Sequence, residues 1–155
     1  MKTEPTNTEP TATYEDISKA LGISRDRYVY IVRYVMQMLK DYQGIIVDVV
    51  KEIPLNLKGK ERHFAIHIIG HSSSPVFSRM NDKEKAGFIR SITEALKISQ
   101  EKAESIIYNM TSETMEKIRK GNIPTVIDII KKVIDSSFTE NEKDYLLFTF
   151  GLVYT

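Results

Sequence analysis

The chain of 155 residues contains no cysteine and no tryptophan. Without cysteine it can form no disulfide, no thiolate nucleophile and no zinc site with sulfur ligands. It also has no apolar run near the 18 residues that a membrane-spanning helix requires, and residues 1–13 lack the apolar core of a signal peptide. From these absences we expect a soluble, cytoplasmic protein without membrane contact.

A strong net charge is missing as well. The 22 lysine and arginine residues nearly balance the 21 aspartate and glutamate residues, which leaves a net charge of +1 at pH 7. Such a chain exerts no overall attraction on nucleic acid or on an anionic membrane, so a basic surface could only be local. The hydrophobic content of 41% and the charged content of 28% are those of an ordinary globular protein.

Recognisable catalytic motifs are the third absence. The sequence has no glycine-rich phosphate loop, no nucleophile elbow and no close pair of carboxylates next to an evident cleft. We therefore assign no catalytic residue and no cofactor, and we expect a protein that is not an enzyme.

What the sequence does contain is an internal repeat. Three pairs of matching segments occur in the same order: ISKALGISRDR at 17–27 with ITEALKISQEK at 92–102, IVDVVKEI at 46–53 with VIDIIKKV at 126–133, and KERHFAIHIIG at 60–70 with NEKDYLLFTFG at 141–151. A repeated order of this kind favours an ancient internal duplication.

The repeat divides the chain into four parts. Residues 1–13 are rich in threonine, proline and glutamate and are predicted to be a disordered tail. Residues 14–71 form the first helical repeat, the polar and turn-rich residues 72–80 form a linker, and residues 81–155 form the second repeat. A half of this size buries too little surface to be stable alone, so we expect the halves to share one core about a pseudo-twofold axis.

The expected fold class is all-α, with about four helices in each half. The apolar spacing at 126–134 is helical, and the repeat extends that prediction to 45–53. Thr139 and Glu142 have capping-box spacing, which favours a helix at 141–151 and, through the repeat, at 63–71. One alternative stays open: an α+β winged first half, in which 45–50 and 63–69 form a β-wing.

The first two helices meet at a short turn. Gly22 can take the left-handed conformation that ends a helix, and Ser24 can cap the next one. In the second repeat, Ser99 is the matching cap, but Lys97 replaces the glycine. If the turn is the same, the lysine costs roughly 1 kcal/mol.

Residues 13–35, TYEDISKALGISRDRYVYIVRYV, resemble the helix-turn-helix superfamily of DNA-binding proteins. The match covers the apolar positions of both helices and the turn, at Ile17, Leu21, Gly22, Ile23, Ser24, Tyr28 and Ile31. The resemblance implies a DNA-binding regulator whose second helix presents Arg25, Arg27, Tyr30, Arg33 and Tyr34 to DNA. Such turns also join helices in proteins that bind no DNA, and structural helix pairing is the alternative.

The three histidines follow a helical spacing. His63, His67 and His71 recur every four residues, so on a helix they share a face. His63 and His67 could chelate a divalent metal ion, although no third ligand and no His-Glu-x-x-His motif accompanies them. The alternative is a partly packed helix face.

The predicted helix at 24–42 has more large side chains than one core-facing stripe requires, namely Tyr28, Tyr30, Tyr34, Met36 and Met38. This excess indicates contact with another helix or subunit. The sequence thus leaves three functions. The first is a non-enzymatic binding or regulatory module that acts through protein–protein or homo-oligomeric contacts. The second is a helix-turn-helix DNA-binding regulator, and the third is a metal-binding protein.

Overall fold

The computed structural model of the chain describes residues 14–43, 45–53, 56–108, 116 and 123–153. Within these ranges the regular secondary structure is helical and no strand occurs, which confirms the all-α class and gives no support to a β-wing. No helix in these ranges is both long and apolar enough to cross a membrane. The predicted tail at 1–13 lies outside the described residues.

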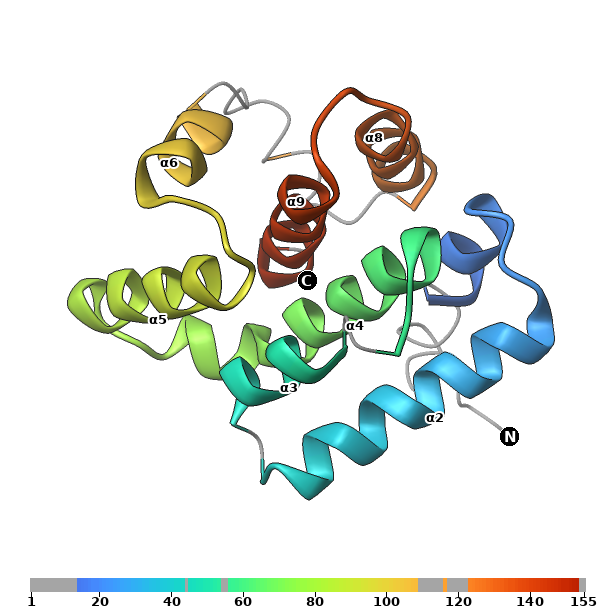
Figure 1. Cartoon of the computed structure of the whole chain (residues 1–155), viewed down its shortest axis with the longest axis horizontal. Helices are drawn as coiled ribbons and strands as arrows, with labels where there is room; N and C mark the ends of the chain where they lie inside the picture. Colours follow the sequence, from blue (N-terminus) through green and yellow to red (C-terminus); the bar gives the residue numbers. More distant parts are fainter. Residues whose placement is uncertain (1–13, 44, 54–55, 109–115, 117–122, 154–155) are drawn as a thin grey trace.

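Two buried helices form the centre of the molecule (Figure 1). They are α4 (Gly59–Ser78) and α9 (Glu140–Val153), which lie against each other along much of their length. All side chains from His63 to Ile69 and from Asp144 to Leu152 are buried. Helices that are buried on all sides carry apolar side chains around most of their circumference, as Phe64, Ile66 and Ile69 do on α4.

A glycine on each central helix allows the two backbones to touch. A Cβ atom on Gly70 would collide with the carbonyl oxygen of Phe148, and one on Gly151 would lie 2.6 Å from the carbonyl oxygen of His67. Gly70 and Gly151 match in the repeat, and so do His67 and Phe148. The contact is therefore reciprocal, which supports a pseudo-twofold relation between the halves; the duplication itself stays a hypothesis.

The first half packs around α4. Residues 14–20 form a short helix, followed by α2 (Arg25–Asp41) and α3 (Ile46–Glu52). The Ser24 hydroxyl accepts a hydrogen bond from the Arg27 N–H, as predicted for a cap. The helix that the repeat predicts at 45–53 is confirmed by α3, whose Val49 and Val50 are fully buried.

The second half consists of α5 (Asp82–Ala95), α6 (Gln100–Tyr108), α8 (Ile123–Ile134) and α9. The predicted capping box is confirmed at Thr139 and Glu142, each of which donates its backbone N–H to the side chain of the other. In Figure 1, α6 and α8 flank α9 on opposite sides, while α5 reaches towards α3 of the first half.

The turn between the first two helices is the same in both halves. Gly22 has φ of 77° and Lys97 has φ of 61°, so the lysine adopts the left-handed conformation that the glycine adopts more easily. The following N–H donates back to the first helix over 2.9 Å in both cases, from Ile23 to Ser18 and from Ile98 to Thr93. The match between 17–27 and 92–102 is therefore a match of backbone conformation as well as of sequence.

The linker predicted at 72–80 is mostly helix. Helix α4 continues to Ser78 with Pro75 inside it. Local signals were misleading here because the serine hydroxyls donate to backbone carbonyls, Ser73 to Ile69 over 2.8 Å and Ser74 to Leu152 of α9 over 2.9 Å. Packing against α9 thus overrides the turn-forming tendency of the serines and the proline.

Candidate functional site

The outer face of α2 carries the predicted DNA-binding residues, but two of its arginines already have acidic partners. Arg25 forms an ion pair with Glu15. Arg27 donates two hydrogen bonds to the carboxylate of Glu61, of 2.9 and 2.8 Å. This contact lowers the pKa of Glu61. Both carboxylates would oppose the approach of a phosphate.

The remaining three predicted residues are close together on this face. Tyr30 and Tyr34 stack with nearly parallel rings and centroids 6.0 Å apart, and the Arg27 guanidinium lies 4.7 Å from the Tyr30 centroid. Arg33 is exposed beside them and forms no ion pair with any described residue. The structure thus groups Arg27, Tyr30, Arg33 and Tyr34, while Arg25 is directed to Glu15.

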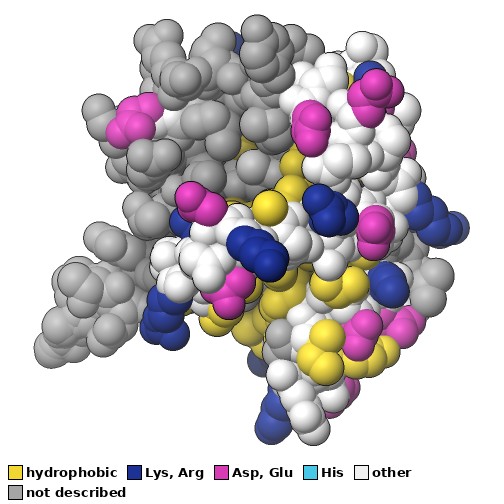
Figure 2. Space-filling model, turned by 90° about the vertical axis from the view of Figure 1, so that its left-hand side faces the viewer, with side chains coloured by type: hydrophobic (Ala, Val, Ile, Leu, Met, Phe, Trp, Pro, Cys, Tyr) yellow, Lys and Arg dark blue, Asp and Glu magenta, His cyan; other side chains and the backbone are white. Residues whose placement is uncertain are grey.

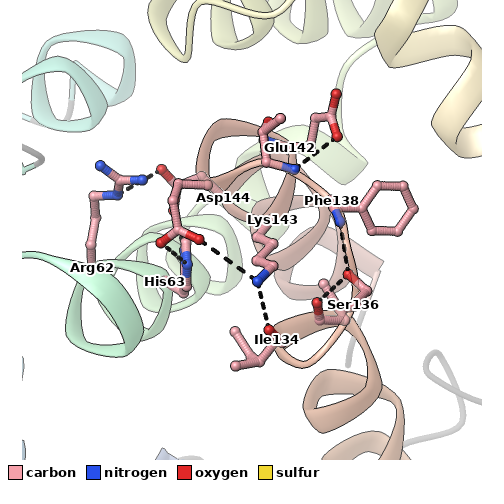
Figure 3. Close-up of polar contacts among 11 residues, drawn as sticks. Arg62, His63, Ile134, Ser136, Phe138, Glu142, Lys143 and Asp144 are labelled. Carbon is pink, nitrogen blue, oxygen red and sulfur yellow. Dashed lines mark hydrogen bonds and ion pairs between the residues drawn. The ribbon is translucent and has the colours of Figure 1, made fainter.

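His63 is buried beside charged side chains at the start of the two central helices (Figure 3). Its Nδ1 lies 2.5 Å from Asp144, and its Nε2 lies 3.1 Å from Glu140. Asp144 is also 3.0 Å from Nε of Arg62. The side chains of His63 and Asp144 are only 2% and 1% exposed. A carboxylate can only accept hydrogen bonds, so both contacts are satisfied together when the ring has a proton on each nitrogen.

His67 has a different environment from His63, although the sequence placed both on one face. Its Nδ1 lies 3.2 Å from the Leu147 carbonyl, and its buried Nε2 has no hydrogen-bond partner. Burial lowers the pKa of His67 to about 4, so the ring is neutral at pH 7. No group of three potential metal ligands occurs among the described residues, and His63 uses both nitrogens. The geometry therefore gives the metal hypothesis no support.

The third histidine fastens the first helix to α4. The Tyr14 hydroxyl is 2.6 Å from Nδ1 of His71, and the Tyr14 ring meets the rings of His71 and His67 edge-on. Burial raises the pKa of Tyr14 to about 12 and lowers the pKa of His71. The contacts of Tyr14 with His67 and His71 hold the first helix against α4, so we assign these two histidines a structural role.

The site that the sequence did not indicate is an apolar hollow of about 270 Å³. It lies where the C-terminal parts of α2 and α4 approach the beginnings of α3 and α5. Seven residues line it: Leu39, Ile46, Ser72, Ser73, Val76, Met80 and Phe88. Val76 at its edge is 57% exposed, and Ile45, next to the lining residue Ile46, is 54% exposed. On the side where α5 lies, hydrophobic side chains gather in a recess between charged ones (Figure 2).

The hollow was missed because its α4 wall coincides with the segment that we predicted as a linker. Once that segment is known to be helical, Ser72 and Val76 have the four-residue spacing of one helix face, and Met80 follows just beyond the end of the helix. The partner of His63 was also within reach of the sequence, because the repeat places His63 and Asp144 at equivalent positions.

The chain was compared with protein-family models, with curated proteins and with solved structures, and no match was found. Fold-level analogy therefore contributes nothing to the choice among the three functions. That choice depends on the chemistry and exposure of the sites themselves.

Proposed function

We propose that the protein is a non-enzymatic binding module and that its binding site for a protein partner is the apolar hollow between α2, α3, α4 and α5. The observation that carries this proposal is the exposure of Val76, which lines the apolar hollow, and of Ile45, which directly precedes the lining residue Ile46. Covering one such side chain with an apolar anchor from a partner is worth about 1.5–3 kcal/mol. Interfaces draw most of their affinity from a few anchors of this kind.

The composition of the hollow favours binding over chemistry. None of its lining residues titrates near neutral pH, and its polar atoms come from Ser72 and Ser73. The Ser73 hydroxyl already donates to the Ile69 carbonyl, and no base is near enough in the lining to activate it. The charged cluster around His63 cannot serve as a substitute, because His63 and Asp144 are buried away from the hollow and from solvent.

The proposal is tested with a fluorescent probe for apolar sites, 1-anilinonaphthalene-8-sulfonate. We expect saturable binding to the native protein at one site, and we expect Val76→Phe, which fills the hollow from its exposed edge, to weaken that binding about tenfold. The matched control is Ala86→Phe, which adds the same ring to an exposed position of α5 outside the hollow. Equal binding by Val76→Phe and by the control would rule out the hollow as a binding site.

DNA binding by α2 is the second candidate, and the observation in its favour is the group of exposed Tyr30 and Arg33 with half-buried Tyr34, on the helix that follows the turn at Gly22. If Arg33 contacts a phosphate, Arg33→Ala lowers the slope of the logarithm of affinity against the logarithm of salt concentration by about one. If Arg33 contacts a base, the substitution lowers the binding free energy by about 1–3 kcal/mol. The measurement is an electrophoretic shift of random duplex at low salt. No shift at micromolar protein would end this candidate, because non-specific affinity shows under those conditions.

A further inference from the structure

We infer that the partner in the hollow is a second copy of this chain, docked about a twofold axis so that Ile45 of each copy enters the hollow of the other. This inference rests on the proposed function of the hollow as a protein-binding site. The structural basis is that an exposed apolar side chain, Ile45, directly precedes Ile46, which lines the apolar hollow.

A twofold interface uses the same patch on both subunits, so the patch must contain both a knob and a hole. Ile45 is the knob: it is more than half exposed and directly precedes α3, whose first residue, Ile46, lines the hollow. A twofold axis that passes between Ile45 and the hollow brings each knob to the opposite hole. The same pairing covers Val76, the most exposed large apolar side chain in the described part of the chain.

The other exposed large apolar residues of the described ranges, Tyr30, Met36 and Phe138, are not lining residues of the hollow. Tyr30 is stacked on Tyr34 beneath the Arg27 guanidinium, towards the opposite end of α2 from Leu39 of the hollow. Phe138 lies between α8 and α9, in a segment that contributes nothing to the lining. Among the described residues we therefore choose the hollow with Ile45 as the self-complementary patch.

The charges beside the hollow are also suited to a second copy. The segments that flank its lining residues carry exposed side chains of both signs, namely the basic Lys40, Arg79, Lys83 and Arg90 and the acidic Asp41, Asp82 and Glu84. Figure 2 shows both signs around the apolar recess. A partner with charge of one sign would meet repulsion as well as attraction, whereas an identical rim in reversed orientation can match opposite charges. With a net charge of +1, two copies also repel each other little.

The interface is small, so the association is weak and depends on concentration. One anchor per copy with its surrounding rim belongs to the class of transient contacts, for which dissociation constants are about micromolar or weaker. We expect a monomer–dimer equilibrium and no larger species, because a twofold contact uses up the patch on both copies.

The experiment is sedimentation velocity on the full chain from about 10 µM to about 1 mM, a range that brackets weak association. We expect the native protein to dimerise and expect Ile45→Asp and Val76→Asp each to raise the dissociation constant at least about tenfold, the change typical of an interface anchor. Tyr30→Asp, which places the same charge on an exposed aromatic position outside the hollow, is expected to leave the dissociation constant within about twofold of the native value.

A second measurement uses the absence of native cysteine. Mild oxidation of a mixture of Ile45→Cys and Val76→Cys chains is expected to give the mixed disulfide in excess over both symmetric ones, because the knob of one copy faces the hole of the other. A preference for the symmetric disulfides would contradict the docking mode.

The outcomes separate this inference from the proposed function. If the native protein stays monomeric at the highest concentration while the anilinonaphthalene probe binds and Val76→Phe abolishes that binding, the second copy is excluded and the hollow remains a binding site. If a dimer forms but Ile45→Asp behaves like Tyr30→Asp, the dimer uses another face and the inference is overturned. If neither dimer nor probe binding is observed, both proposals fall.

Discussion

The two halves of the chain open with the same backbone turn and display different side chains around it. The turns at Gly22 and Lys97 share their left-handed φ and their hydrogen bonds, and Ser18 and Thr93, the buried acceptors of these bonds, match in position. On the exposed side, the tyrosine of α2 at position 30 corresponds to Ser105 of α6. The comparison shows that the turn is maintained by buried packing, so its presence alone does not indicate DNA binding.

The central helices repeat this contrast inside the core. Gly70 and Gly151 are identical because either Cβ atom would collide with a backbone. Around them the halves differ: His63 faces its own counterpart Asp144, and a symmetric pair would bring two like groups together instead. Matching positions of the two halves that contact each other thus carry complementary side chains.

The largest effect is expected from the reciprocal glycines. Gly70→Ala and Gly151→Ala should each lower the free energy of unfolding by about 3 kcal/mol or more, the upper end for overpacking, because the colliding atoms belong to backbone and cannot rotate away. Gly87→Ala on α5, where a Cβ meets no atom within 4 Å, should be neutral or stabilising by up to about 1 kcal/mol. Guanidinium unfolding measures all three. Clearly different free-energy losses for Gly70→Ala and Gly151→Ala would contradict a reciprocal contact between the two helices.

The buried pair should come next. Asp144→Asn removes the negative charge that Arg62 and His63 both contact, although the amide oxygen can still accept a hydrogen bond. We therefore expect a loss of about 3 kcal/mol, at the lower end for a broken buried ion pair. Replacing His63 and Asp144 together by leucine should cost much less than the sum of the two single changes. The control is the exposed pair of Lys132 and Asp128, whose loss should change the unfolding free energy by less than about 0.5 kcal/mol.

His67 should make the stability of the protein depend on pH, and its matching residue in the second half, Phe148, cannot titrate. The pKa of His67 is lowered from 6.5 to about 4 in the folded chain, so between these values the unfolded chain binds more protons and stability falls as the pH falls. From pH 7 to pH 5 this amounts to about 2 kcal/mol. The His67→Leu variant should lack this loss of stability. The difference in unfolding free energy between the variant and the native protein should therefore change between pH 7 and pH 5. A constant difference across this range would contradict the assignment.

The smallest effects are expected at the turns. Lys97→Gly should stabilise the protein by about 1 kcal/mol, and Gly22→Ala should destabilise it by a similar amount, because both residues have positive φ. Thermal melts of the two variants are enough to establish the opposite signs. Two changes of the same sign would mean that the turns are less alike than their hydrogen bonds indicate.

The sequence was most informative where one half could clarify the other. The helix at 46–52, the cap at Ser99 and the capping box at Thr139 all followed from spacing together with the repeat. The segment at 72–80 was mispredicted, since its serines and proline signal a turn locally while contact with α9 makes it helical. The hollow depends on that long-range contact, so no local pattern could reveal it.

The shared core of α4 and α9 is tested most directly by native-state hydrogen exchange. Because the two helices contact each other through both glycines, amides such as those of Ile68 and Leu147 should exchange only by global unfolding, with equal free energies of opening. The opposite result would be exchange of the α9 amides through a partial opening of the second half while α4 stays protected. That pattern would show two independently stable halves in place of one reciprocal core.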